Sequence, residues 1–449
     1  MLRDYQARAL AHVDARFAEG RRAVLVASPT GSGKTRMGAA YVARRLDAGV
    51  SQILWLAHRT ELVEQAAATL ESTGLRVGVI AASSERAPDP SAPVQVASTQ
   101  TLLARPHLAL DPGLVALDEA HHYPAEEWAS LMMRWPRALR LGLSATPAAS
   151  NGAALSPLFD SMVVAATIRG LTAEGHLAPL DVVAPSKALR AGQIAQSPVA
   201  AYEQYARGRQ AVVFAPHVAA ANAFADAFDL RGIRASIVYG DLPADLRRKR
   251  LAAYEAGDIR VLVNVGILTE GWDHPPTGVA ILARRCGSIV LYLQIAGRIL
   301  RPHPSKARAL FIDLTGAVHL HGRPDDDRVF SLEGQAIRRG EDAPPGSFCG
   351  VCGALLAASL CEECGYERPA QEAPKVVSAP MRKLARDFCA GDSAATQVGR
   401  LARWIREGSN KGHKLGAAKF RFKACYGRWP TSREMTTALD ICVGIRSAS

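Results

Sequence analysis

The chain has 449 residues, 48% of them hydrophobic and 21% charged, and a formal net charge of +12 at pH 7. This length predicts two to four domains, and the composition is that of an ordinary globular protein, which excludes a disordered or fibrous chain. No apolar run reaches the ~18 residues of a membrane span, and the N-terminus lacks a signal-peptide core, so we expect a cytoplasmic protein with no membrane partner. The positive charge suits either a polyanionic partner or a solvated basic surface, and composition alone leaves both open.

The first third of the chain alternates short apolar runs with segments of helical spacing. Strands are expected over residues 23–27, 52–56, 94–97, 114–117 and 139–143. The intervening segments, such as 60–70, repeat apolar residues at the spacing of a helix. Alternating strands and helices predict a buried parallel sheet that is covered by helices.

A second series of the same kind begins near residue 210, after a joining region at 165–209. Its expected strands are 211–215, 235–239, 261–264, 279–282 and 309–312. A cysteine module, a linker at 371–380 and a basic tail, which we expect to be helical, come after it. The predicted fold is therefore α/β, with parallel-sheet domains at 1–165 and 166–335, a small ribbon at 345–368 and a tail domain at 380–449.

A glycine-rich turn follows the first strand and opens a helix. Its sequence is Ser28-Pro29-Thr30-Gly31-Ser32-Gly33, continuing into Lys34-Thr35. Such a turn points backbone N–H groups inward, and the helix N-terminus adds positive potential, which together suit a nucleotide phosphate. We expect Lys34 to reach the β and γ phosphates of ATP, and the Thr35 hydroxyl to bind Mg²⁺.

Two carboxylates follow the strand at 114–117. Asp118 ends that strand, so its side chain is delivered to the same sheet edge as the phosphate loop. We expect Asp118 to hold Mg²⁺ through water, and Glu119 to orient or deprotonate the attacking water. The pair predicts hydrolysis of the bound nucleotide.

Gln294, Arg298 and Arg301 form a third group, near the end of the second series. On a helix the two arginines would share one face, and Gln294 would lie one further turn back. Arginines aimed at the γ-phosphate would stabilise the charge that develops in phosphoryl transfer. A surface helix with salt bridges has the same spacing, but beside an intact phosphate loop we favour the arginine-finger role.

Taken in order, these motifs resemble those of superfamily 2 helicases and translocases over about residues 1–320. Further matching segments are 2–6 (LRDYQ), 57–62 (AHRTEL), 98–101 (STQT), 144–147 (SATP) and 269–273 (TEGWD). The resemblance implies two tandem RecA-like domains that clamp ATP between them and hold a nucleic-acid strand across their tops.

The resemblance also implies roles for single residues in the matching segments. Adenine would be recognised by Gln6 with support from Arg3, and the nucleotide would be approached by Gly271 and Asp273. His121 would couple the site to Gln294. Contacts to the strand backbone would come from Arg59, Thr99, Gln100 and Thr269. Helix capping is the competing explanation for Thr99, which follows a strand.

Within the superfamily, the chain looks most like RadD-type bacterial DNA-repair ATPases and similar phage helicases. The features that carry this likeness are the Asp-Glu-Ala-His-His box at 118–122, the cysteine module and the tail segment at 411–430. The likeness implies a bacterial cytoplasmic protein associated with the nucleoid, with repair or recombination proteins as possible partners.

Two C-x-x-C-G pairs, eight residues apart, form the cysteine module, which contains Cys349, Cys352, Cys361 and Cys364. Four thiolates around one ion make a closed tetrahedral site, so we expect structural Zn²⁺. An iron–sulfur cluster and a redox dithiol are the less favoured alternatives.

The segment from 381 to 449 interleaves basic and aromatic residues. This mixture suits either a single nucleic-acid strand or the core of a small helical bundle. As a whole, the sequence predicts an ATP-dependent DNA helicase or translocase acting in repair or recombination. An RNA helicase is one alternative, and an ATPase that binds DNA structures or partner proteins without unwinding is another.

Overall fold

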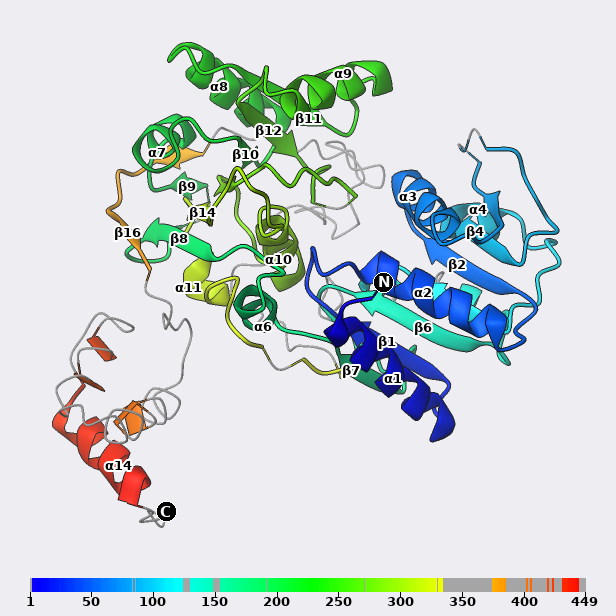
Figure 1. Ribbon diagram of the computed structural model, residues 1–449. Helices are drawn as coiled ribbons and strands as arrows, with labels where there is room; N and C mark the ends of the chain where they lie inside the picture. Colours follow the sequence, from blue (N-terminus) through cyan, green and yellow to red (C-terminus); the bar gives the residue numbers. More distant parts are fainter. Residues whose placement is uncertain are drawn as a thin grey trace, which may run out of the picture.

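The computed structural model contains two α/β domains, each built on one sheet, and a small helical unit near the C-terminus (Figure 1). The residues that the structure describes are 2–82, 84, 86–123, 130–147, 154–190, 192–269, 271–328, 330–333, 374–384, 401–402, 404–405, 418–419, 422–423 and 430–443.

The first domain is built on a seven-stranded sheet with the order β3-β4-β2-β5-β6-β1-β7. Its strands are β1 (Ala23–Ala27), β2 (Ile53–Ala57), β3 (Val77–Ile80), β4 (Val94–Ser98), β5 (Leu114–Leu117), β6 (Leu139–Ser144) and β7 (Ser161–Val164). Its helices are α1 (Asp4–Ala18), α2 (Lys34–Asp47), α3 (Thr60–Glu71), α4 (Thr99–Ala104) and the 3₁₀ turn η1 (Ala120–His122). All strand pairs are parallel, and β1, β2, β4 and β5 are buried along their whole length, because helices cover both faces.

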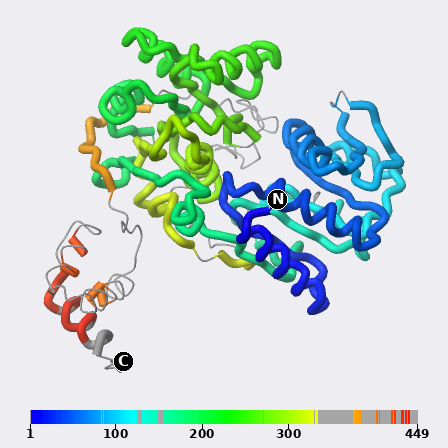
Figure 2. Tube along the Cα trace, viewed as in Figure 1, coloured from blue at the N-terminus to red at the C-terminus, as the bar shows by residue number. Residues whose placement is uncertain are grey.

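The second domain has a sheet with the order β11-β12-β10-β13-β14-β8-β16. Its strands are β8 (Leu180–Pro185), β10 (Ala211–Phe214), β11 (Ala235–Tyr239), β12 (Val261–Val265), β13 (Val279–Leu282), β14 (Ala309–Asp313) and β16 (Met381–Lys383). Its helices are α6 (Ile168–Ala173), α7 (Pro198–Tyr205), α8 (Val218–Asp229), α9 (Ala244–Glu255), α10 (Ile289–Gly297) and α11 (Val318–His321). A short pair, β9 (Gln193–Ile194) with β15 (Lys375–Val376), lies beside this sheet (Figure 2).

The strand order of the first sheet determines where the candidate site lies. The strands β2, β5, β6 and β1 are consecutive neighbours, so their carboxyl ends meet at one edge. Backbone hydrogen bonds link these ends, because the Ser28 N–H donates to the Ser144 carbonyl at 2.9 Å and the Asp118 N–H to the Leu56 carbonyl at 3.0 Å. Segments far apart in the sequence are thereby brought together.

Several strands were not expected from the sequence. β3 and β7 are short strands at the two edges of the first sheet, and β8 lies in the region that was expected only to join the domains. β16 comes from the segment assigned to the tail, and it pairs antiparallel with β8, while β15 lies in the expected linker. Of these strands, β3, β7 and β16 lie at sheet edges, whereas β8 pairs with β14 on one side and β16 on the other.

One buried arginine attaches β16 to the second domain. The Arg323 side chain is 1% exposed, forms an ion pair with Asp325 and donates to the carbonyls of Leu180 and Leu384, each at 3.1 Å. The carbonyls belong to β8 and to the residue after β16. The guanidinium therefore holds both strands at the edge of the sheet.

Replacing Arg323 by Ala is expected to lower the free energy of unfolding by about 3–5 kcal/mol, because Asp325 and two buried carbonyls lose their partner. Chemical denaturation followed by circular dichroism measures this change. Arg382→Ala, an exposed position on β16, is the matched control and should shift stability by less than about 0.5 kcal/mol.

The helical unit near the C-terminus has an apolar cluster of its own. It includes Trp404 and Phe422, which are 3% and 0% exposed, and Met435 of α14 (Ser432–Val443). Trp404 and Phe422 therefore pack in a core. The sequence left two roles open for the aromatic residues of this segment, binding a nucleic-acid strand or forming the core of a helical bundle, and these two residues have the second role. Among the described residues, no helix is both long enough and apolar enough to cross a membrane.

Candidate active site

The glycine-rich turn between β1 and α2 has the geometry of a phosphate loop. Gly31 and Gly33 have φ values of +86° and +77°, a region that side chains rarely adopt, and Gly33 is the N-cap of α2. The Ser28 and Ser32 hydroxyls hydrogen-bond at 2.7 Å, which fixes the two ends of the turn. Lys34 is the first residue of α2, and its side chain is buried.

The two predicted carboxylates lie at the end of β5, opposite this loop. The Lys34 Nζ and a Glu119 carboxylate oxygen are 3.8 Å apart, and both side chains are nearly buried. Glu119 has φ +46° and ψ +55°, a left-handed backbone that is costly for a residue with a side chain. The Asp118 carboxylate accepts from the Glu119 N–H at 3.0 Å, which stabilises the sharp turn.

A buried chain of hydrogen bonds connects these carboxylates to the second domain. His121 Nδ1 lies 3.1 Å from the Ser144 hydroxyl, which in turn donates to the Thr146 carbonyl at 2.7 Å. On its other side, His121 Nε2 lies 3.3 Å from the Gln294 side-chain nitrogen. A neutral imidazole with its proton on Nδ1 satisfies all of these contacts, since the Gln294 amide then donates to Nε2. The contact expected between His121 and Gln294 is present.

The second domain contacts the phosphate loop directly through the end of α10. A Cβ atom added at Gly297 would lie 2.4 Å from the Thr30 Cβ, and one added at Gly31 would lie 3.2 Å from the Arg301 Cγ. Arg301 also forms an ion pair with Asp273, and burial lowers its pKa to about 10, so the side chain stays charged at neutral pH. The structure thus places Arg301 against the loop and pairs it with Asp273.

The helical spacing predicted for the two arginines is wrong in part. Helix α10 ends at Gly297, so Arg298 is its C-cap and Arg301 lies beyond it. The chain tightens here into i→i+3 turns, with N–H groups of 298, 299 and 300 bonded to the carbonyls three residues earlier. Arg298 Nη1 donates to the Trp272 carbonyl at 2.6 Å, whereas Arg301 lies against the loop.

Replacing Gly297 by Ala is expected to reduce ATP turnover about tenfold or more, since the new methyl group would occupy the space of the Thr30 side chain. A displacement of about 1 Å at a reacting centre can cost 10²-fold in rate. Steady-state hydrolysis and a thermal melt test this prediction together, because the clash lies between domains and the melting temperature should change little. Gly287→Ala, where nothing lies within 4 Å of the added carbon, is the matched control.

The predicted adenine-reading residues lie at the rim of the loop, near the start of α1. The Gln6 amide nitrogen donates to the Ser32 carbonyl at 2.9 Å, and its oxygen accepts from the Arg3 N–H at 2.9 Å. Tyr5, which the sequence reasoning did not single out, also donates to the Ser32 carbonyl and is 3% exposed. These contacts hold the Gln6 amide against the loop and leave its oxygen one further lone pair.

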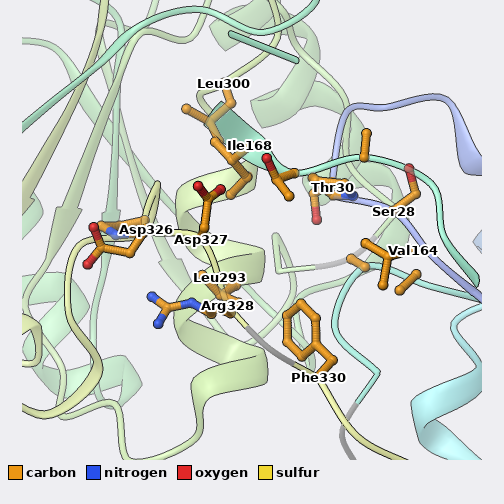
Figure 3. A pocket seen from close by; sticks show the side chains of 17 residues that line it. Ser28, Thr30, Val164, Ile168, Leu293, Leu300, Asp326, Asp327, Arg328 and Phe330 are labelled. Atoms are coloured by element: carbon orange, nitrogen blue, oxygen red, sulfur yellow. The ribbon is translucent and has the colours of Figure 1, made fainter. Parts of the chain in front are cut away.

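A cavity of about 50 Å³ lies behind the phosphate loop, between the two domains (Figure 3). Ser28 and Thr30 line it from the loop, Val164 and Ile168 from the connection between the domains, and the segment 324–330 from the far side. Asp326 in that segment accepts from Arg169 Nη2 at 2.9 Å, and burial raises the pKa of its carboxyl group.

The segment after α11 then returns to the first domain. The Leu332 carbonyl accepts from the N–H groups of Leu155 and Ser156 at 2.7 and 3.0 Å. Leu332 packs on the first domain's core, whereas Phe330 packs on a cluster of the second. Sequence reasoning missed this connection, because backbone groups make its hydrogen bonds and no local pattern predicts them.

The residues expected to contact a nucleic-acid strand differ in exposure. Gln100 is exposed and Arg59 is partly exposed at the N-cap of α3, whereas Thr269 is 7% exposed. Thr99 is fully buried, and its hydroxyl donates to the Ala57 carbonyl at 3.0 Å. The expected side-chain contact from Thr99 is therefore corrected to a structural hydrogen bond between β2 and the start of α4.

The remaining predicted residues are placed as follows. Thr35 is partly buried in the first turn of α2, and Gly271 has φ +73° beside Leu62 of α3. Cys349, Cys352, Cys361 and Cys364 lie outside the described residues. In the described part of the chain, no group of three or more His, Cys, Asp or Glu side chains could hold a metal ion.

Two family models match the chain, one in each domain. The model described as the res subunit of type III restriction enzymes matches residues 1–149, which contain the phosphate loop and both carboxylates. The model described as the conserved C-terminal domain of helicases matches residues 196–303, which contain Gln294, Arg298 and Arg301. The two models thus cover the two sides of the site.

The similarity of the chain to individual proteins agrees with these two family models. A 51.5 kDa protein of a Lactococcus phage is 27% identical over 372 residues, which are 78% of this chain and 79% of the phage protein. The ATP-dependent DNA helicase RecG of Acidithiobacillus ferridurans is 26% identical over 66% of this chain, which spans 45% of RecG. The type ISP restriction-modification enzyme LlaBIII, solved bound to DNA, superposes with a TM-score of 0.55 at 17% identity over 72% of this chain and 29% of that enzyme.

Proposed function

The chain belongs to superfamily 2 of the helicases and is an ATP-hydrolysing enzyme, and from this premise we propose that it is a DNA-stimulated motor that moves along or remodels DNA. The observation that carries the proposal is the contact between Gln294 of the second domain and His121 of the first. Because this contact joins the two sides of the nucleotide site, the state of the nucleotide and the relative position of the domains are linked.

The residues of the loop would bind and orient the triphosphate. Backbone N–H groups of residues 31–35 would face the phosphates, and Lys34 would neutralise charge on the β and γ groups. Thr35 and Asp118 fit the oxygen ligands that Mg²⁺ prefers, and when bound the ion neutralises charge on the phosphates. Glu119 would take the proton of the attacking water. Its carboxylate lies beside the phosphate loop, 3.8 Å from the Lys34 ammonium, and so within reach of a water near the bound phosphates.

Arginines from the second domain would complete the site only when the domains are closed. Arg301 lies on Gly31, so its charge reaches the phosphates only while α10 packs on the loop. The guanidinium would then stabilise the charge that develops as the terminal phosphate leaves. Hydrolysis would weaken this attraction and open the domains, and repeated closing would move a strand held across them.

DNA is the proposed polymer, because RecG is named as a DNA helicase and LlaBIII was solved on DNA. Arg59 and Gln100 are the proposed backbone contacts, since both are accessible at the ends of β2 and β4. Contacts of this kind would position a strand without reading its sequence. A role in repair or recombination, as in RadD-type ATPases, is the finer proposal.

Steady-state ATP hydrolysis tests the function with no nucleic acid and with single-stranded, duplex and forked DNA or RNA, each at two salt concentrations. Strong, salt-sensitive stimulation by DNA over RNA is the expected result, because released counterions make such binding weaker in salt. Preference for RNA would identify an RNA helicase. Turnover that no nucleic acid changes would overturn the motor and leave an ATPase that serves protein partners.

The four cysteines of the ribbon are proposed to hold structural Zn²⁺, on the evidence of their spacing alone. Elemental analysis of the purified protein should find one zinc per chain and no iron. Two irons or four per chain, with visible absorbance, would instead identify a cluster.

A further inference from the structure

Three histidines form one stack beside the active site. The ring centroids of His58 and His122 are 3.9 Å apart, and those of His122 and His121 are 4.2 Å apart. His121 belongs to the chain of hydrogen bonds described above, but His58 and His122 have no part in the proposed chemistry. Both of these side chains are partly buried.

The order of the strands explains the stack. His58 directly follows β2, and η1 follows β5, its neighbour in the sheet. The left-handed backbone at Glu119 turns the chain into η1. The side chains of the consecutive residues His121 and His122 then face different neighbouring strands. His121 faces Ser144 at the end of β6, whereas His122 faces His58 at the end of β2. The rings thus cross the carboxyl ends of three neighbouring strands.

The two ends of the stack lie at different functional surfaces. At one end, His121 contacts Gln294 of the second domain. At the other end, His58 precedes Arg59, the N-cap of α3 and a proposed contact to the strand backbone. His122 lies between them, since its ring contacts both of the others.

We propose that His122 is a positioning residue that transmits nucleic-acid binding at Arg59 to the hydrolysis site. The inference rests on the proposed function. The flat rings are in van der Waals contact, so a shift of the backbone at His58 displaces His122 and then His121. The distance of 3.3 Å between His121 and Gln294 is at the long end for a hydrogen bond, so a small displacement of His121 changes the strength of the contact that joins the domains.

His122→Ala tests the proposal. Removing the ring should reduce the stimulation of ATP hydrolysis by single-stranded DNA by about 5- to 10-fold, which is typical of the coupling between two sites. Turnover without DNA and the affinity for DNA should both stay within about twofold of wild type. His122→Phe should restore stimulation, because it keeps a flat ring in the stack.

His58→Ala breaks the other contact of the same ring and serves as an independent variant. The double variant should lose no more stimulation than either single variant, since both interrupt one path. His12→Ala, an exposed position on α1, is the control and should be stimulated like wild type. Thermal melts of all variants show that each is folded.

The outcomes separate the two proposals. A wild-type enzyme that no nucleic acid stimulates would overturn the proposed function, and the coupling with it. A stimulated wild type together with an equally stimulated His122→Ala variant would overturn the coupling alone. If the His122→Phe variant regains no stimulation by DNA and also loses turnover without DNA, the ring only supports the fold.

Discussion

Replacing Glu119 by Gln is expected to lower the rate of ATP hydrolysis by about 10³-fold, because the amide cannot accept the proton of the attacking water. The substitution preserves size and shape, so the left-handed turn at this residue and the neighbouring bond to Asp118 should persist. Turnover is measured under saturating ATP, and binding is measured separately with a fluorescent nucleotide.

Nucleotide binding should remain near the wild-type level in this variant, since the phosphate loop is unchanged. Glu19→Gln, an exposed carboxylate at the end of α1, controls for the loss of one negative charge. Hydrolysis within about tenfold of wild type would remove Glu119 from the catalytic role and would point to another base.

Replacing Arg301 by Ala is expected to lower turnover by about 10³-fold or more while sparing ATP binding, because arginine fingers contribute chiefly to the transition state. The same split between binding and turnover is expected for Arg298→Ala. Arg301 lies against Gly31 of the phosphate loop, which is the contact that supports its role. Single-turnover hydrolysis separates the chemical step from product release.

Arg301→Lys should rescue only a small part of the rate, because a point charge does not replace the planar fork of a guanidinium. Arg231→Ala, an exposed arginine after α8, is the control for a lost positive charge. A near-normal rate in Arg301→Ala would show that this residue only pairs with Asp273.

Much of this architecture follows from the sequence because its signals are local. The inner strands β1 and β5 are short apolar runs, because burial on both faces of a sheet requires such runs. The phosphate loop was equally predictable, since Gly31 and Gly33 occupy positions that only glycine adopts easily. The contact between His121 and Gln294 could be expected only through resemblance to a family, because 173 positions separate the two residues.

What the sequence could not reveal depends on long-range packing. The hydroxyl of Thr99 has the chemistry of a phosphate contact, and only the fold shows that it is buried against the Ala57 carbonyl. The end of α10 is the exception, because Gly297 and Pro302 are local signals of a helix end. The return of Leu332 to the first domain has no local pattern, because backbone groups make its hydrogen bonds.

The path of the chain between the domains limits how they can move. Within the part of the chain that the structure describes, one connection between the domains lies between Val164 and Ile168, and another lies between Pro324 and Leu332. Both connections line the same small cavity behind the phosphate loop (Figure 3). A body tied to another at two neighbouring points keeps little freedom to slide or separate, and its easiest motion is rotation about the line through those points. ATP would therefore act on a hinge whose axis is built into the backbone, and each turnover would swing the second domain along one repeatable arc.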